Sequence, residues 1–178
     1  MADKSLEERV KFLEAKVRTL EDIDEIRKVM AKYTYTMDKW LPDRVMTCFA
    51  KECSADFGDV GICKNRAEVE DFFRNRIGKT FIEFCHQISN EIIEVKDEKN
   101  ATGRWYLHEA CILQKTKNAA WLQCLYDIFF TKEDGHWLLK HVACREAHFI
   151  SDYDKGWVKE RFTISPGKVK EPSILPPL

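Results

Sequence analysis

Residues 81–115 decide the fold and have the sequence FIEFCHQISNEIIEVK-DEKN-ATGRWYLHEACILQK. Apolar and polar side chains alternate through the first and third of these segments, with the two-residue period of a strand that buries one face. The middle segment, Asp97-Glu98-Lys99-Asn100, consists of polar residues that favour a turn. The stretch therefore predicts two long antiparallel strands joined as a hairpin.

Two more alternating runs lie downstream, at residues 119–131 and 137–149. Turn residues precede each run, Thr116-Lys117-Asn118 before the first and Glu133-Asp134-Gly135 before the second. Four long strands joined by short turns predict an antiparallel, strongly curved sheet. One face of such a sheet is apolar and requires a second layer to cover it.

The second layer is predicted from the helical pattern upstream. Apolar residues at three- and four-residue steps predict helix from the N-terminus to about Trp40, with Pro42 ending it and a break near Glu21-Asp22 left open. Shorter predicted elements are a helix over 43–49, a strand over 53–57, a turn over 58–61 and a helix over 67–76. The sequence therefore predicts an α+β fold, with N-terminal helices covering one face of the sheet, in a single domain over residues 1–164.

The two ends of the chain carry features that do not belong to the sheet. Within residues 1–22 the apolar positions form a short a/d seam of Leu6, Val10, Leu13, Val17 and Leu20. This seam packs either on its own domain or on a neighbouring subunit, and the pattern leaves both open. Residues 165–178 hold four of the five prolines, and we expect an extended tail that lies over a neighbouring subunit.

Composition excludes several classes of function. The 178 residues carry a net charge of −1, so no basic excess indicates nucleic acid. No apolar run approaches the roughly 20 residues that span a bilayer, and no secretory leader is recognisable, so we expect a cytoplasmic protein without a membrane partner. The seven cysteines are odd in number and form no CxxC pair, which argues against disulfides and structural zinc.

Motifs for nucleotides and metals are also missing from the sequence. We find no P-loop, no GxGxxG, no HExxH and no GxSxG. His141 and His148 are seven apart on one predicted strand and so face opposite ways. Neither a metal nor a cofactor is therefore expected.

Strand alternation places three ionisable residues on apolar faces. His86 shares a face with Ile82, Phe84 and Ile88, and Glu109 shares one with Trp105, Leu107, Cys111 and Leu113. Arg145 lies near the end of the row that begins with Trp137 and Leu139. Upstream, Tyr33 and Met37 share a helix face and Asp38 lies one position round.

Each of these residues also has an ordinary structural explanation. A lone histidine on an apolar face is more often a satisfied core residue, and Glu109 and Arg145 can form a plain buried ion pair. Their combination favours function, because buried charges require partners and a concave sheet facing a helix forms a pocket. Ionisable groups that converge in a pocket are typical of active sites.

The same residues carry a resemblance to a known family. Ala-Thr-Gly-Arg-Trp-Tyr-Leu at 101–107, Leu-Glu-Glu-Arg-Val at 6–10 and Lys-Tyr-x4-Asp at 32–38 resemble the SnoaL-like family. That family has the cone fold of nuclear transport factor two, and the resemblance covers roughly residues 5–162. Within the family the chain is most similar to bacterial bile-acid 7α-dehydratases and more distantly to scytalone dehydratase and hexachlorocyclohexane dehydrochlorinase. A cone-shaped curved sheet is what this resemblance implies.

The resemblance also implies roles for individual residues. Tyr33 matches the active-site tyrosine, Asp38 the aspartate that orients the histidine, and His86 the general base. Arg145 matches a pocket arginine, expected to bind substrate. Glu109 stands where the bile-acid enzymes carry an aspartate, so its carboxyl group lies one methylene further out, and we expect it to act as a catalytic acid.

The sequence departs from that of the bile-acid enzymes at one further position. Phe57 stands where they carry a pocket tyrosine, which removes a hydroxyl group. Phe57 and Trp105 belong to an aromatic supply that suits an apolar, polycyclic ligand such as a steroid, although aromatic residues also fill ordinary cores. We expect both of them to contact substrate.

The resulting hypothesis is a cofactor-independent dehydratase, a lyase that removes water from a hydroxylated, carbonyl-activated polycyclic substrate such as a steroid or bile-acid derivative. Whether that substrate is a coenzyme A thioester is left open, and a homotrimer is what the resemblance implies. One alternative is a ketosteroid-type isomerase or polyketide cyclase on the same fold. A second is a non-catalytic domain that binds a small ligand, which we would prefer if Asp38 and His86 lie far apart.

Overall fold

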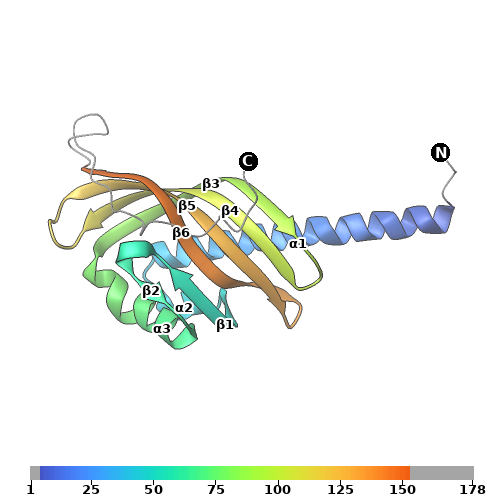
Figure 1. Ribbon diagram of the computed structural model, residues 1–178, viewed down its shortest axis with the longest axis horizontal. Coiled ribbons are helices and arrows are strands. Elements are labelled where there is room, and N and C mark those ends of the chain that lie inside the picture. Colours follow the sequence, from blue (N-terminus) through green and yellow to red (C-terminus); the bar gives the residue numbers. More distant parts are fainter. Residues whose placement is uncertain (1–4, 153–178) are drawn as a thin grey trace.

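Six strands form one curved, unclosed sheet in the order β2-β1-β6-β5-β4-β3 (Figure 1). This computed structural model describes the backbone of residues 5–152 and the side chains of residues 5–145. The strands are β1 (Phe49–Asp56), β2 (Ile62–Cys63), β3 (Phe81–Val95), β4 (Asn100–Leu113), β5 (Ala119–Glu133) and β6 (His136–Asp152). Strands β3 to β6 pair antiparallel, as predicted, whereas β1 pairs parallel to β6.

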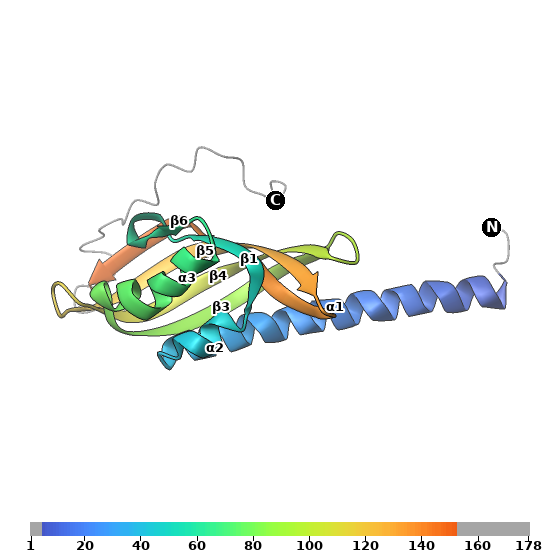
Figure 2. The ribbon, with the colours of Figure 1, turned by 90° about the horizontal axis from the view of Figure 1, so that it is seen from below.

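The helices lie on one side of the sheet (Figures 1 and 2), so the predicted α+β layer pair is confirmed. They are α1 (Leu6–Asp38), α2 (Pro42–Met46) and α3 (Arg66–Asp71). Three single turns complete the elements: η1 (Gly58–Val60), the π-helical η2 (Phe72–Arg76) and η3 (Ile77–Lys79). The proline-rich tail at 165–178 lies outside the described residues. None of the described helices is long and apolar enough to cross a membrane.

Helix α1 is one continuous helix from its cap to its last turn. Ser5 caps it in a reciprocal capping box with Glu8. The break considered near Glu21-Asp22 does not occur. Instead Asp22 accepts hydrogen bonds from Lys132 Nζ at 2.6 Å and Trp137 Nε1 at 2.8 Å, which tie the middle of α1 to the β5–β6 turn.

The N-terminal part of α1 extends beyond the sheet (Figures 1 and 2). Residues 5–20 are all exposed, including every member of the a/d seam. Partial burial begins at Asp22 and Ile23, and Ile26 and Met30 are fully covered. The interpretation in which the seam packs on its own domain is therefore wrong for the residues that the structure describes.

The C-terminal end of α1 is a Schellman motif with a tryptophan in the left-handed position. Leu41 N donates to Thr36 O at 3.0 Å, and Trp40 N donates to Met37 O at 2.9 Å. Trp40 has φ +52°, in the left-handed region that few residues other than glycine and asparagine adopt readily. Its ring packs on Phe84 of β3 at a centroid distance of 4.7 Å, which fixes the last turn of α1 against the sheet.

A bulge in β3 sets which residues face each other across the β3–β4 hairpin. Near the turn Val95 pairs with Ala101, but beyond the bulge between Ser89 and Ile92 the register shifts by one residue. Asn90 lies at this bulge with φ +54°. The shift pairs His86 with Glu109 and turns even-numbered residues of β3 inward. The register set by the turn alone would pair His86 with Ala110.

Bulges of the same kind occur at the start of β3 and within β6, and each reverses the strand face that was predicted there. At the start of β3 the register shifts between Phe81 and Glu83, so Phe81 is buried and Ile82 is 40% exposed, the reverse of the prediction. In β6, Leu139 pairs with Phe130 and His141 with Phe129, which leaves Lys140 as the extra residue. Beyond Lys140 the even residues Val142 and Cys144 face the helices.

We predict that Asn90→Val destabilises the protein more than Asn90→Gly. Asn90 is exposed, so the difference between the variants reports the backbone at the bulge. A β-branched residue in the left-handed region costs about 1–3 kcal/mol, whereas glycine adopts it freely. Urea unfolding of both variants measures the difference. Equal free energies of unfolding would contradict a bulge that depends on this conformation.

Candidate functional site

A histidine–aspartate pair links α1 to the centre of the sheet. His86 Nδ1 lies 2.6 Å from Asp38 Oδ1, and the backbone N–H of His86 also donates to both Asp38 oxygens at 3.1 and 3.2 Å. The aspartate accepts the proton of Nδ1, which leaves Nε2 of the neutral ring without a proton. The side chain of His86 is 4% exposed and that of Asp38 is 16% exposed, so solvent screens the pair little.

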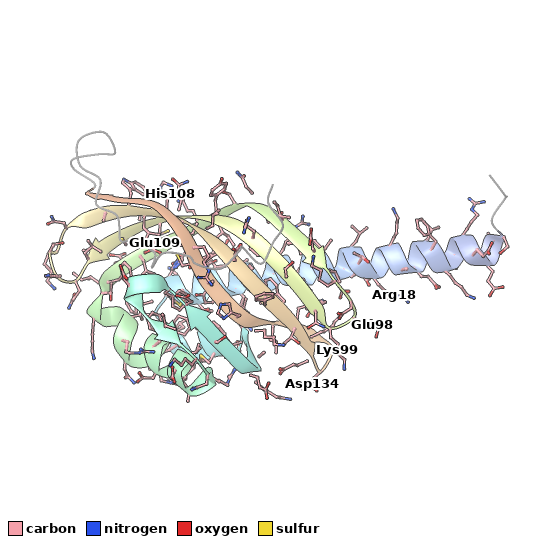
Figure 3. The ribbon with its side chains drawn as sticks, viewed as in Figure 1. Arg18, Glu98, Lys99, His108, Glu109 and Asp134 are labelled. Atoms are coloured by element: carbon pink, nitrogen blue, oxygen red, sulfur yellow. The ribbon has the colours of Figure 1, made fainter. Side chains whose placement is uncertain are left out.

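Glu109 lies on the other side of the imidazole ring. Because β3 and β4 pair His86 directly with Glu109, the two side chains leave the sheet side by side, and Glu109 Oε2 lies 3.5 Å from His86 Nε2. The other oxygen of this carboxyl group, Oε1, makes no hydrogen bond to any described residue. Figure 3 labels Glu109 and its neighbour His108, which belong to opposite faces of β4.

Burial and charge shift the pKa values of both groups. Burial raises the pKa of Glu109 above its usual range, with the Asp38 charge adding to this and the His86 charge opposing it. For His86, burial by itself lowers the pKa. The hydrogen bond to Asp38 and the charges of Glu109 and Asp38 outweigh burial, so the pKa of His86 is raised. Because the two groups lie 3.5 Å apart, they titrate as a coupled pair.

Two tyrosines complete the polar groups of the site. Tyr33 on α1 is fully buried and its ring packs edge-on against that of Tyr126 at 6.4 Å. The Tyr33 hydroxyl lies near that of Tyr126 but makes no hydrogen bond of normal geometry with any described residue. Burial raises the pKa of both phenols, so both remain protonated donors. A buried hydroxyl with an unused proton is available to a ligand.

These polar groups open into an apolar cavity of about 70 Å³ between the sheet and the helices. Its polar lining comes from Tyr33, His86, Glu109 and Tyr126, with Asp59 at the η1 turn. The rest of the lining is apolar or backbone: Met37, Phe57, Gly58, Val60, Phe72, Phe73, Ile77, Phe81, Leu107, Leu122 and Cys144. Pockets for drug-sized ligands measure about 300–1,000 Å³, so a ligand of several rings requires this cavity to expand.

The η1 turn forms one wall of the cavity. Phe57 lies directly before it and stacks on Phe72 at 4.9 Å, at the position where the sequence predicted a pocket residue. The turn is held by Asp56 Oδ1, which accepts a hydrogen bond from Gly58 N at 3.0 Å. Gly58 has φ +58°, a conformation that glycine adopts without strain.

Arg145 does not reach the cavity, which corrects the prediction of a pocket arginine. Arg145 Nη1 lies 3.2 Å from Asp56 Oδ2 and not beside Glu109, because the bulge at Lys140 turns Arg145 to the outer face of β6. Its influence on the cavity is indirect, since Asp56 also holds the Gly58 turn. The buried Arg145–Glu109 ion pair considered from the sequence is therefore wrong.

Trp105 shares the inward face of β4 with Glu109 but is not among the cavity-lining residues. It packs edge-on against Phe130 at 6.0 Å, nearer the β3–β4 turn. A Cβ on Gly103 would lie 2.3 Å from the Trp105 ring, so the glycine is what admits the indole. In this structure Trp105 is a buried core residue that does not line the cavity.

Sequence reasoning missed several lining residues. Tyr126 belongs to the even, inward face of β5, and extending the alternation argument to that strand would have placed it in the pocket. Phe72 and Phe73 line the cavity together, as consecutive residues on the apolar stripe of a helix can. The segment is the π-helical turn η2, where the sequence pattern predicted a regular helix.

Cysteine and metal chemistry receive no support from the described residues. All seven cysteines are free thiols. Burial raises the pKa of Cys48, Cys53 and Cys63, and burial together with Glu109 raises that of Cys111 to about 12. No group of three or more potential metal ligands occurs within the part of the chain that the structure describes.

The arrangement is suited to moving protons in an apolar environment. Nε2 of His86 can accept a proton, the neutral carboxyl group of Glu109 can donate one, and the Tyr33 hydroxyl can stabilise a developing oxyanion. The non-catalytic alternative was to be preferred if Asp38 and His86 lay far apart. The two side chains are instead in hydrogen-bond contact.

Comparison with solved structures identifies proteins of the same fold. A candidate scytalone dehydratase from Novosphingobium aromaticivorans DSM 12444 aligns with a TM-score of 0.68 and 22% identity, over 83% of this chain and 95% of that one. Hexachlorocyclohexane dehydrochlorinase from Novosphingobium barchaimii LL02 aligns with a TM-score of 0.70 and 14% identity, over 77% and 93%. At these identities the likeness concerns the cone fold alone.

Solved structures of this fold carry names that specify different activities. A candidate aromatic ring hydroxylase from Novosphingobium aromaticivorans aligns with a TM-score of 0.66 and 18% identity, over 75% of this chain and 94% of that one. The family assignment comes instead from the sequence, because residues 18–143 match the SnoaL-like domain. These residues include the helix end with Tyr33 and Asp38, and the strands with His86 and Glu109, so the chain belongs to the SnoaL-like domain family.

Proposed function

We propose that this protein is a cofactor-independent dehydratase that eliminates water from a hydroxylated, carbonyl-activated cyclic substrate. The observation that carries the proposal is the sequence of contacts from Asp38 through His86 to Glu109, which ends in an apolar cavity. His86 as a base and Glu109 as an acid therefore lie on the same side of the cavity. Solved relatives whose names specify dehydration or dehydrochlorination agree with this class of reaction.

His86 acts as the base. Its Nε2 takes the proton from the carbon that the substrate carbonyl acidifies, and the electron pair passes toward the carbonyl oxygen as an enolate or dienolate. Asp38 holds the Nδ1–H tautomer and stabilises the imidazolium that forms. The Tyr33 hydroxyl, which is free to donate, stabilises the negative charge on the carbonyl oxygen.

Glu109 acts as the acid in the second half of the reaction. The enolate expels the hydroxyl group, the C–O bond breaks, and Glu109 supplies the proton that turns the leaving group into water. The imidazolium of His86 then returns its proton to Glu109 across the 3.5 Å contact, so both groups recover their starting states. Substrate becomes product plus water, and no redox step is involved.

The size of the cavity bears on the substrate. About 70 Å³ accepts only part of a steroid, so we propose that the ring with the hydroxyl group enters beside His86 and that the η1 turn is displaced. The remaining rings would lie against Phe57 and Phe72. A steroid or bile-acid derivative, free or as a coenzyme A thioester, is the finer proposal, and smaller cyclic hydroxyketones belong in the same test.

An isomerase on this site is less well supported. Such an enzyme requires an ionised carboxylate as its base, whereas burial raises the pKa of Glu109 and favours the neutral acid. His86 and Glu109 together supply both groups that elimination requires.

We predict that His86→Ala lowers turnover by at least about 10²–10⁴-fold, the usual contribution of a general base. Turnover is followed by the extended-diene absorbance that appears from hydroxylated 3-oxo-Δ4 steroids, free and as thioesters, and from monocyclic hydroxyketones. The matched control is His136→Ala, because the His136 side chain is 78% exposed and far from the cavity lining. A His86→Ala variant as active as the control would overturn the mechanism.

The pH dependence of kcat/KM should show the raised pKa of His86. The base works only when neutral, so activity rises as pH increases through its pKa, and the midpoint lies above 6.5. Asp38→Asn removes a charge that raises this pKa and replaces a charge-assisted hydrogen bond with a weaker neutral one. The rising limb of that variant should therefore shift to lower pH while kcat falls. A rising limb that stays in place would show that Asp38 does not set the pKa of His86.

Glu109→Gln tests the acid separately from the base. We predict a loss of about 10²–10⁴-fold in kcat on a hydroxylated substrate, because glutamine cannot supply the proton. A substrate with chloride in place of the hydroxyl group needs no acid, so this variant should convert it at nearly the wild-type rate. His86→Ala should fail on both substrates. Equal losses for Glu109→Gln on both would contradict the assignment of Glu109 as the acid.

A further inference from the structure

The first part of α1 is an arm whose residues are all exposed. This arm, residues 6–20, projects beyond the sheet in both ribbon views, and Figure 3 labels Arg18 on it. A capping box at Ser5 and continuity with the buried half of α1 stabilise the helix at both ends of the arm.

One face of the arm is apolar and unusually exposed. Its seam is Leu6, Val10, Leu13, Val17 and Leu20, whose exposed fractions range from 45% at Val10 to 76% at Leu6. The steps of four, three, four and three residues place valine at both a positions and leucine at all three d positions. The seam stops where the helix reaches its own sheet, since the next a and d positions are Asp24 and Arg27.

The residues beside the seam carry charge of one sign on each side. With Val10 and Val17 at a, the e positions are Glu7, Glu14 and Glu21. The g positions within the arm are Arg9 and Lys16. Charged e and g positions determine the partner and the orientation of a coiled coil.

We propose that the arm forms a parallel, two-stranded coiled coil with the arm of a second copy of this chain. In a parallel pair each g residue faces the e residue of the next heptad in the other strand, so Arg9 meets Glu14 and Lys16 meets Glu21. Each attraction occurs twice by symmetry. An antiparallel pair would place glutamates against glutamates and basic residues against basic residues. Valine at a with leucine at d favours two strands.

The charge pattern argues against a membrane surface as the occupant. A helix that lies on anionic lipid concentrates lysine and arginine on its polar face, whereas here Glu7, Glu8 and Glu14 alternate with Arg9 and Lys11. Phe12, the other large apolar residue of the arm, is 50% exposed and lies at a c position away from the seam. It therefore offers a matched control for substitutions in the seam.

The first test measures the mass of the full-length chain by light scattering across a wide concentration range. We expect twice the chain mass of 20.9 kDa, and a shift to the single-chain mass for the double variant Val10→Asp/Leu13→Asp. Phe12→Asp, which adds the same side chain to the same helix, should keep the wild-type mass. Thermal melts of all three proteins check that the domain remains folded.

The second test exchanges the charges. Glu14→Lys/Glu21→Lys makes both flanks basic, and Arg9→Glu/Lys16→Glu makes both acidic, so each variant alone should lose association. An equal mixture of the two should recover the two-chain mass, because every facing pair is then attractive. Orientation is tested with Leu6→Cys, which should form a 6–6 disulfide between copies, identified by peptide mass.

Four outcomes would overturn the proposal. These are a wild-type chain that stays monomeric at all concentrations, a seam variant that associates as well as wild type, charge variants that do not recover on mixing, and absence of the 6–6 disulfide. A mass of three chains, which the family resemblance implies, would also overturn the two-stranded arrangement.

Discussion

Asp38 holds the protein's two layers together at the point where its chemistry is concentrated. Its carboxylate is the last group of α1 and accepts hydrogen bonds from both the ring and the backbone N–H of His86 on β3. A carboxylate at the C-terminal end of a helix faces the negative end of the helix dipole, an unfavourable position that its bonds to β3 offset. Because Trp40 packs on Phe84 just beyond it, neither the helix end nor the strand can shift without disturbing the histidine.

The electrostatics of the site follow from the same arrangement. Three ionisable groups, Asp38, His86 and Glu109, form a line that runs from a partly exposed carboxylate to a fully buried carboxyl group. The outer member is hydrogen-bonded to His86 and 16% exposed, whereas burial raises the pKa of the inner one, Glu109.

The apolar cavity surrounds the buried end of this line of ionisable groups. Its apolar walls include four phenylalanine rings, those of Phe57 directly after β1, Phe72 and Phe73 in η2, and Phe81 at the start of β3. Arg145 acts on this wall from outside, through Asp56 and the turn at Gly58. A residue of this kind can influence which ligands enter without touching them, which is why fold and family resemblance alone do not assign the substrate.

Much of the fold could be predicted from the sequence because alternation and helical spacing are local properties. The long strands, the polar turns and the apolar faces of His86 and Glu109 all follow from period-two patterns. Their direct pairing does not, since it depends on a one-residue bulge at Asn90 that no period reveals. A second bulge at Lys140 moved Arg145 to the opposite face, which is why that residue was misplaced. The sequence by itself therefore determined the layers, the inward row of β4, and the presence of an apolar seam on α1. Only the tertiary structure decided which side chains meet, because register and π-helical turns depend on how whole elements pack and not on the residues within each element.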